Sequence, residues 1–135
     1  METQLVIIAN DIYNSLGPGY NEVIYHRAFE VALRLSTIPY ESEVVTPIFY
    51  KGHNIGHGRV DIKLDNFIIE LKAINTLNND AIIQTKNYMS HYNITTGIVI
   101  NFGGKFGLGI ILIKDNLIYD FINGNYLQRN EINVN

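Results

Sequence analysis

Two carboxylates and a lysine flank a short loop, and their residue types are those that can hold a divalent cation and assist a hydrolysis. Asp61 precedes the loop Asp65-Asn66, and Glu70 and Lys72 follow it. The stretches on either side are extended in pattern, and a two-residue loop between such stretches predicts a β-hairpin. Pairing the strands across the loop places Asp61 opposite Glu70. Lys72 lies on the same side, because alternate residues of a strand share a face.

The same pairing predicts one apolar and one polar face for the hairpin. The apolar face consists of Val60, Ile62, Leu64, Phe67, Ile69 and Leu71. The polar face carries Lys63 opposite Ile68 and Arg59 opposite Lys72, in addition to the two acids. We expect the apolar face to lie in the core.

Carboxylates that face each other across a ladder destabilise it unless something compensates their charge. A divalent cation is one candidate, since Mg²⁺ is commonly held by one or two carboxylates together with waters and phosphate oxygens. Lys72 could then hold an attacking water or stabilise charge developing on a phosphate. The alternative is a solvated face on which Arg59 and Lys72 neutralise the acids. The hairpin alone leaves both interpretations open.

A third carboxylate, Glu22, falls on the inward stripe of a predicted helix. It precedes Tyr25, Phe29 and Ala32 by three, seven and ten residues, a spacing that puts all four on one face. A carboxylate aimed at a core is costly unless it is paired, protonated or bound to a metal. Alternatively, Glu22 simply lies in the first turn, where the helix dipole favours a negative charge.

Gln84 and Tyr88 are four residues apart on another predicted helix and therefore share a face. An amide and a phenol beside a phosphate site could orient a water or a backbone oxygen of the substrate. They could equally form an ordinary half-buried pair. The four histidines lack the spacing of zinc ligands, so a zinc enzyme is not expected.

The elements that would position these residues follow from hydrophobic periodicity and turn residues. Helical spacing predicts helices over residues 5–16, 20–35 and 81–92, with Gly17-Pro18-Gly19 ending the first and Asn78-Asn79-Asp80 capping the third. Extended patterns predict strands over residues 44–50, 59–64, 67–73 and 97–101, with a turn at 51–54, a hairpin of 110–113 and 117–121 around Asp115-Asn116, and a loose polar tail from Asn123. This order predicts an α/β sandwich with a mixed sheet.

Length and composition favour one soluble domain. The chain has 135 residues, of which 47% are hydrophobic and 17% charged, enough for one core. The absence of cysteine excludes disulfides, zinc ribbons, iron–sulfur clusters and thiol catalysis. The net charge of -3 does not by itself indicate nucleic-acid binding, although bound divalent cations would add positive charge. No signal peptide or membrane span is recognisable, so we expect a soluble intracellular protein, cytoplasmic by default, with a nuclear or viral setting left open.

Together these residues resemble a known family. The segment Gly19-Tyr-Asn-Glu22-Val-Ile-Tyr25 matches the pattern GxxExxY, which names a branch of the PD-(D/E)XK nuclease superfamily. The resemblance runs from Leu16 to Gly103 in one order and register. It also includes Ile38-Pro-Tyr-Glu41, Tyr50-Lys-Gly52, Gly58-Arg-Val-Asp61, Ile69-Glu-Leu-Lys-Ala73, Gln84 with Asn87-Tyr88, and Gly97-Ile-Val-Ile-Asn-Phe-Gly103.

The resemblance implies a restriction-endonuclease-like three-layer sandwich, with a central mixed β-sheet flanked by helices in a single domain over residues 1–135. Residues 5–103 would be its core. Residues 104–135, which depart from the family pattern, would add a C-terminal hairpin and tail. Val60 stands where the superfamily's name has proline, and His57-Gly58 stand where members more often have an acidic and an aromatic residue. Neither departure removes a catalytic position.

The resemblance also implies roles for single residues. Asp61 and Glu70 match the metal-binding acids, and Lys72 matches the catalytic lysine. Glu22 matches an acid that many members contribute from the first core helix, and Gln84 matches a polar position on the helix after the motif. Members typically cleave phosphodiester bonds in DNA with Mg²⁺ or Mn²⁺ and use a water as the nucleophile.

Two functional hypotheses follow. The first is a Mg²⁺- or Mn²⁺-dependent nuclease that acts on nucleic acid, with DNA as the expected substrate. Its metal ligands would be Glu22, Asp61, Glu70 and the backbone carbonyl of Leu71. Lys72 would assist the attacking water, and Gln84 would position that water or the phosphate. Contacts with nucleic acid would come from Arg59, Lys63, Lys86 and Tyr88, with Lys105 as a further candidate.

The second hypothesis is the same fold kept as a binding module for nucleic acid or protein, with little or no turnover. The short chain has no separate DNA-reading domain, which favours this alternative, whereas the intact acid–acid–lysine set favours the nuclease. A homodimer would suit a nuclease, because cutting both strands of a duplex needs two sites.

Overall fold

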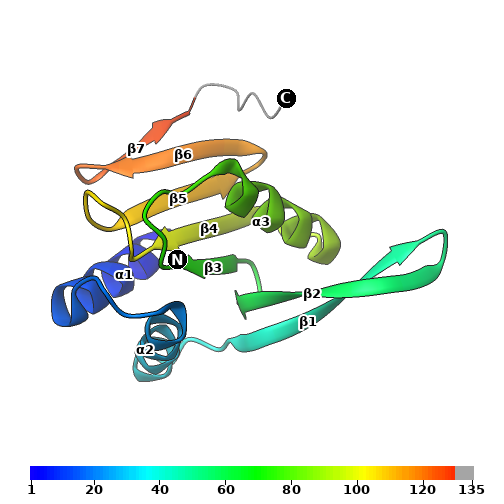
Figure 1. Ribbon diagram of the computed structural model, residues 1–135, viewed down its shortest axis with the longest axis horizontal. Coiled ribbons are helices and arrows are strands. Elements are labelled where there is room, and N and C mark those ends of the chain that lie inside the picture. The colour runs from blue at the N-terminus through cyan, green and yellow to red at the C-terminus, as the bar shows by residue number, and fades with distance from the viewer. Residues whose placement is uncertain (130–135) are drawn as a thin grey trace.

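The computed structural model describes residues 1–129. A seven-stranded sheet forms its centre, with the strands in the order β1-β2-β3-β4-β5-β6-β7. β3 and β4 run parallel, and the other neighbouring strands run antiparallel. The first two helices cover one face of the sheet and the third covers the other (Figure 1). The predicted three-layer α/β sandwich with a mixed sheet is confirmed.

Every predicted helix and strand is present, and most differences in their bounds are a few residues at the ends. In chain order the elements are α1 (Glu2–Leu16), α2 (Glu22–Leu35), β1 (Glu41–Tyr50), β2 (His53–Lys63), β3 (Ile68–Lys72), α3 (Asn79–Tyr92), β4 (Thr96–Asn101), β5 (Gly109–Lys114), β6 (Leu117–Ile122) and β7 (Asn125–Gln128). No helix within the described residues is both long and apolar enough to cross a membrane.

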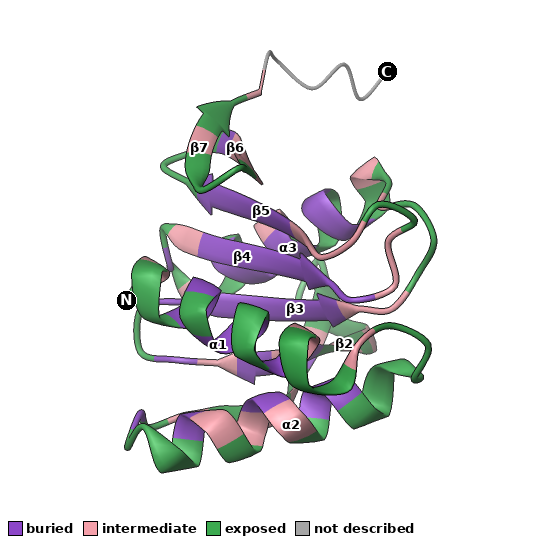
Figure 2. Ribbon diagram, turned by 90° about the vertical axis from the view of Figure 1, so that its left-hand side faces the viewer, coloured by how far each residue is buried: buried purple, intermediate pink, exposed green. Residues whose placement is uncertain are grey.

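The core is divided by the sheet into two layers (Figure 2). Under α1 and α2, side chains such as Leu5, Phe29 and Leu33 pack on Ile69 and Ile98. Under α3, a second set packs on the opposite face and includes Ile82, Met89, Ile68, Val99 and Ile111. β3 and β4 are buried on both faces, which explains their nearly continuous apolar sequences.

α2 begins later than periodicity predicts, at Glu22 instead of Tyr20. Asn21 is its N-cap, and the backbone N–H of Tyr20 donates to the hydroxyl of Tyr25 at 3.3 Å. At α3 the predicted cap is confirmed, because the side chain of Asn78 accepts a hydrogen bond from the Asp80 N–H at 3.1 Å.

β1 and β2 form a longer ribbon than predicted. β2 begins at His53, whereas the sequence pattern begins at Arg59. Lys51 and Gly52, at φ values of 48° and 80°, make a two-residue turn in place of the predicted four-residue turn. Most of the residues between His53 and Arg59 are exposed, so burial imposes no apolar alternation on them. Pairing with β1 keeps this segment extended.

The predicted apolar face of the hairpin is wrong at Val60. Ile62, Leu64, Phe67, Ile69 and Leu71 do pack under α1 and α2, but Val60 packs under α3. Glu43, next to this point on β1, has a φ of 52° and interrupts the regular extension of the ribbon. The register pairs Ser42 with Ile62 and Val44 with Val60, and these two rows point to opposite sides of the sheet.

The C-terminal strands confirm one prediction and correct another. Asp115 and Asn116, at φ values of 50° and 66°, form the predicted turn between β5 and β6. The tail predicted to be loose from Asn123 instead makes a second tight turn at Asn123-Gly124 and continues as β7. Asn-Gly is a strong hairpin sequence, so the signal was present. The rest of the predicted tail, residues 130–135, lies outside the described residues.

Candidate active site

β2 and β3 part from each other at the two acids. Their ladder pairs Lys63 with Ile68 and Ile62 with Ile69. Beside this ladder, carboxylate oxygens accept the hydrogen bonds that backbone carbonyls accept in a regular sheet. The Asp61 N–H donates to Oε2 of Glu70 at 2.8 Å, and the Leu71 N–H donates to Oδ2 of Asp61 at 2.8 Å. The structure therefore brings Asp61 and Glu70 together, as the hairpin pairing predicted, at the opening of a fork between the strands.

Glu70 lies in an environment that opposes its negative charge. Its side chain is almost completely buried, with 2% exposed. This burial and, next, the charge of Asp61 raise the pKa of Glu70 from 4.5 to about 8. The hydrogen bond from the Asp61 N–H and the charge of Lys72 act in the opposite direction without compensating. Near neutral pH the fork therefore retains a proton, unless another positive charge replaces it.

The other two acids show the same tendency. Burial raises the pKa of Asp61, against the hydrogen bond from Leu71 and the charges of His26 and Lys72. Burial and then the charge of Asp61 raise the pKa of Glu22. Three carboxylates thus share an excess of negative charge that Lys72 offsets only in part.

Glu22 reaches this cluster from the first turn of α2. A cavity of about 320 Å³ between α2 and β2 is lined by Glu22, His26, Arg59 and Asp61, among others. Tyr25 positions the start of the helix: its hydroxyl donates to the carbonyl of Gly17 at 2.6 Å, and its ring stacks on Phe102 at 4.4 Å. Glu22 itself is exposed, so it faces the cavity from the helix end and does not lie in the core as the stripe suggested.

Lys72 ends β3 beside a loop that is fixed by a buried amide. Asn101, at the end of the neighbouring strand β4, accepts from the Ile74 N–H at 3.0 Å and donates to the Ile74 carbonyl at 2.8 Å. Gly103 allows this approach, because a Cβ there would lie 2.5 Å from the carbonyl carbon of Ala73. The backbone directly after Lys72 is therefore held in place.

From the other face of the sheet, α3 contributes Gln84 and Tyr88. Tyr88 is buried, and its hydroxyl accepts from the Arg59 N–H at 3.1 Å and from Nε2 of Gln84 at 3.4 Å. Its proximity to β2 depends on Gly58, where a Cβ would lie 2.6 Å from the Tyr88 hydroxyl. Burial raises the pKa of Tyr88, and the charges of Glu70 and Asp61 add to this effect. The predicted shared face of Gln84 and Tyr88 is confirmed.

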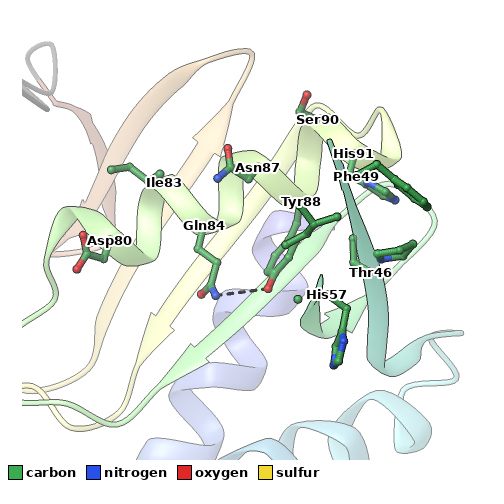
Figure 3. A pocket seen from close by; sticks show the side chains of 13 residues that line it. Thr46, Phe49, His57, Asp80, Ile83, Gln84, Asn87, Tyr88, Ser90 and His91 are labelled. Atoms are coloured by element: carbon green, nitrogen blue, oxygen red, sulfur yellow. Dashed lines mark hydrogen bonds between the residues drawn. The ribbon is translucent and has the colours of Figure 1, made fainter. Parts of the chain in front are cut away.

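A groove extends from Tyr88 between α3 and the β1–β2 ribbon. Its volume is about 810 Å³. Figure 3 shows Gln84, Asn87 and Tyr88 along one wall and Thr46, Phe49 and His57 on the opposite side. Asp80 lies at the far end of the helix wall. The groove thus presents apolar, amide and imidazole groups beside Tyr88, whose hydroxyl accepts from the Arg59 N–H two residues before Asp61.

The predicted basic contacts divide into two groups. Arg59 lines the cavity beside Asp61 and Glu22. Lys63 is directed to the end of α3, where its Nζ lies 5.2 Å from the centre of the Tyr92 ring and 4.0 Å from Glu41. Lys86 lines a separate cavity with Asp115 and Asn116, and Lys105 lies in the loop after β4, where its N–H donates to the carbonyl of Asn75 at 3.3 Å. The structure does not bring Lys86 to the acid cluster.

His26 is a further residue of the site that was not predicted from the sequence. It lies one helical turn after Glu22, and one ring nitrogen is 2.9 Å from Oγ of Ser42 and 3.3 Å from Glu30. Its spacing of four residues from Glu22 on the same predicted helix was the available signal.

The oxygen ligands at the fork suit a small hard cation that keeps part of its shell open, and they do not form a closed cage of protein ligands. Among residues 1–129, no group of three or more His, Cys, Asp or Glu side chains could hold an ion. Asp61 and Glu70 converge, and the Leu71 carbonyl faces the same fork as its N–H, because both groups of a strand residue point to one neighbour. Mg²⁺ is typically held by one or two carboxylates, with waters and phosphate completing its shell, so this set suits it.

The site thus consists of acids at a fork in the mixed sheet of an α/β protein, with a lysine two residues further along the strand. Residues 1–111, from α1 into β5, match the family model of the PD-(D/E)XK nuclease superfamily. The chain belongs to this superfamily. The match does not distinguish the GxxExxY branch, which stays a prediction.

One solved structure gives independent support for the fold. The chain is similar to the crystal structure of SSO0001, with a TM-score of 0.56 and 20% sequence identity. The similarity covers 70% of this chain and 50% of that one, so this chain spans about half the length of SSO0001. No curated protein matches the sequence.

Proposed function

We propose that this protein is a divalent-metal-dependent nuclease that hydrolyses phosphodiester bonds in DNA at the fork between β2 and β3. The observation that carries this proposal is the meeting of Asp61 and Glu70 in a buried fork, where the pKa of Glu70 is raised to about 8. Membership of the PD-(D/E)XK superfamily supports phosphodiester hydrolysis as the reaction.

In this proposal Asp61, Glu70 and the Leu71 carbonyl hold Mg²⁺ or Mn²⁺, and Glu22 serves the same site from α2. When bound, the cation polarises a phosphate oxygen and lowers the pKa of a water. With such a cation bound, Glu70 would no longer need the proton that it otherwise retains. The ligands thus match their electrostatic environment only when the cation is present.

The remaining residues act on the substrate. The ammonium of Lys72 stabilises charge that develops on the scissile phosphate or holds the attacking water. Gln84, held by Tyr88, positions that water or a phosphate oxygen from the α3 side. Arg59 lines the same cavity, 4.0 Å from Glu43, and would contact a flanking phosphate.

Cleavage of labelled DNA tests the proposal. We would compare the parent chain with Glu70→Gln and Lys72→Met, using single-stranded, double-stranded and branched DNA and RNA, with Mg²⁺ or Mn²⁺. Each variant should lose activity by about 100-fold or more, because each removes a group that acts on the transition state. Lys114→Met, an exposed lysine on β5, is the matched control and should cut like the parent. Equal cutting by all four chains would assign the activity to a contaminant.

A binding module without turnover is the second candidate. The observation that favours it is that Asp61 and Glu70 each already use one oxygen on a backbone amide. Binding of Mn²⁺ separates the candidates, since a ligand that binds only the folded state raises the melting temperature. The nuclease requires a rise in the parent that Asp61→Ala loses. No rise, together with no cutting of any substrate, would favour the binding module.

A further inference from the structure

The β1–β2 ribbon reaches beyond the rest of the molecule, to the right in Figure 1. Its strands pair with each other from Val44–Val60 out to Tyr50–His53. β2 pairs with β3 only at Ile62 and Lys63, so the outer ribbon receives no support from the rest of the sheet. Exposed two-stranded ribbons of this kind can enter the major groove of duplex DNA.

The outer segment of the ribbon, residues 44–60, carries a charge opposite in sign to that of the whole chain. Residues 44–60 contain no Asp or Glu, two cationic residues, Lys51 and Arg59, and two histidines. Residues 44–60 therefore carry +2, whereas the chain carries -3, which leaves -5 for all other residues. At the base of this segment Arg59 lies 4.0 Å from Glu43, so Lys51 at the tip is the cation that is available to a partner. A segment with only positive charges on an acidic protein is complementary to a phosphate backbone.

The tip adds exposed apolar side chains to this charge. Phe49 is 57% exposed, Tyr50 59% and Ile55 65%. Nζ of Lys51 lies 5.4 Å from the centre of the Tyr50 ring. Apolar groups next to a cation suit the sugars and thymine methyl groups that flank phosphates in a DNA groove.

The ribbon is also continuous with the proposed active site. Asp61 follows Arg59 on the same strand, and the groove lined by Phe49, His57 and Asn87 leads back to Tyr88 (Figure 3). His53 is eight residues before Asp61, which corresponds to about 26 Å at the rise of a β-strand. This distance equals about 8 base pairs of duplex.

We propose that the β1–β2 ribbon is a duplex-binding arm that contacts a DNA groove about 8 base pairs from the phosphate at the fork. The position of that phosphate rests on the proposed function. Lys51 contacts the backbone at the tip, and Phe49, Tyr50 and Ile55 line the groove beside it. Pairing of two ribbons from two copies of the chain is less favourable, because it brings positive charges together.

Binding to duplexes of two lengths tests the arm. We would measure fluorescence anisotropy of 8- and 24-base-pair duplexes, with Glu70→Gln introduced into every chain to prevent cutting. In the trimmed variant, Asn-Gly replaces residues 48–56 and joins Pro47 to His57, which are paired with each other. The longer duplex should bind the untrimmed chain at least about tenfold more tightly than the shorter one, and the trimmed variant should lose this gain, because several phosphate contacts go with the tip.

A single substitution provides a second measurement that does not depend on refolding of the ribbon. Lys51→Gln should lower the slope of log Kd against log salt for the 24-mer by about one, the value for one phosphate contact. Lys114→Gln removes the same charge from β5 and should keep the slope of the untrimmed chain. An unchanged slope in Lys51→Gln, or an equal gain with length in the trimmed variant, would overturn the proposal.

The remaining outcomes are distinguishable. Loss of a dimer on trimming, measured by sedimentation without DNA, would make the ribbon an interface between copies and overturn the arm. An equal gain with length on single-stranded DNA would overturn contact with a duplex groove. If the parent cuts DNA but trimming the ribbon does not change duplex binding, only this inference is refuted. Ribbon-dependent duplex binding without cutting would refute only the proposed function.

Discussion

Glu70 combines two features that conflict without a further partner. Its carboxylate accepts a backbone hydrogen bond, as a charged acceptor does well, but its burial beside Asp61 disfavours the charge. A proton resolves the conflict in the free protein, and a divalent cation would resolve it in a loaded one. Binding of a proton and binding of a divalent cation at this site therefore both depend on the side chain of Glu70.

This conflict predicts how stability depends on pH. The folded pKa of Glu70, about 8, is raised above the ordinary value of 4.5, so the stabilising contribution is complete below about pH 4.5 and is lost as pH rises towards 8. We expect the melting temperature of the metal-free protein to fall by several degrees between pH 5 and pH 8. Circular dichroism melts at intervals of one pH unit would measure it.

Glu70→Gln is the control for this prediction. The amide oxygen can still accept from the Asp61 N–H, but the group no longer titrates. Its melting temperature should be flatter over the same range. A parent curve as flat as that of the variant would show that Glu70 ionises without cost in the folded state.

At this scale the sequence predicted the acids well and their supports poorly. Asp61, Glu70 and Lys72 could be placed because a two-residue loop fixes the register of a hairpin. Asn101 could not, because its partner Ile74 is distant in sequence and becomes a neighbour only through the packing of whole elements. His26 could have been placed from its spacing to Glu22, but its contact with Ser42 could not.

At the scale of elements, α2 is held at its N-terminal end by one tyrosine. The hydroxyl of Tyr25 joins the Gly17 carbonyl and the Tyr20 N–H, while its ring stacks on Phe102. The turn before α2 is therefore connected both to the helix and to the end of β4. Because Glu22 is the first residue of the helix, its position depends on this connection.

The substitution Tyr25→Phe should distinguish the role of the hydroxyl in positioning Glu22 from the role of the ring in packing. The ring and its stacking remain, and the two hydrogen bonds are lost. We expect a loss of about 1–2 kcal/mol in the free energy of unfolding, measured by urea denaturation. We also expect kcat for DNA cleavage to fall under conditions where the variant is still fully folded, because Glu22 shifts. Tyr20→Phe, at an exposed side chain, is the control. A variant with full kcat and reduced stability would limit Tyr25 to a structural role.

Sequence patterns succeeded for elements with at least one buried face and failed where burial imposes no pattern. The three helices and the strands from β3 to β6 follow their apolar residues. The outer part of β2 is exposed and contains Gly, His and Asn, so its extended form comes from pairing with β1 alone. Val60 was assigned to the wrong face because strict alternation was assumed along residues 59–64, whereas Val60 and Ile62 pack on opposite sides of the sheet.

At the scale of the whole molecule, the strands differ in how many elements pack against them. β3 and β4 are buried between α1, α2 and α3, whereas the two strands of the outer ribbon, residues 48–56, hydrogen-bond only with each other in the sheet. The fold class could be predicted from the order of elements. The difference in packing between core strands and ribbon could not, since it depends on how far each strand extends past its neighbours.

Hydrogen exchange should reveal the difference. We expect amides of residues 48–56 to exchange at least about 100-fold faster than those of β3 and β4, because the ribbon opens without global unfolding. Mass spectrometry of peptides covers all three segments. Adding a 24-base-pair duplex to Glu70→Gln should slow exchange in the ribbon and leave β4 unchanged. Equal protection of ribbon and core in the free protein would contradict this description.

The fork between β2 and β3 has a mechanical consequence. Only two residue pairs join these strands in a ladder, and Asp61 and Glu70 stand on opposite arms immediately beyond it. Each carboxylate also accepts a backbone hydrogen bond from the other strand at 2.8 Å. We therefore expect that bending of the ribbon at its tip, about 26 Å away, changes the separation of the carboxylates and with it the affinity of the fork for a proton or a cation.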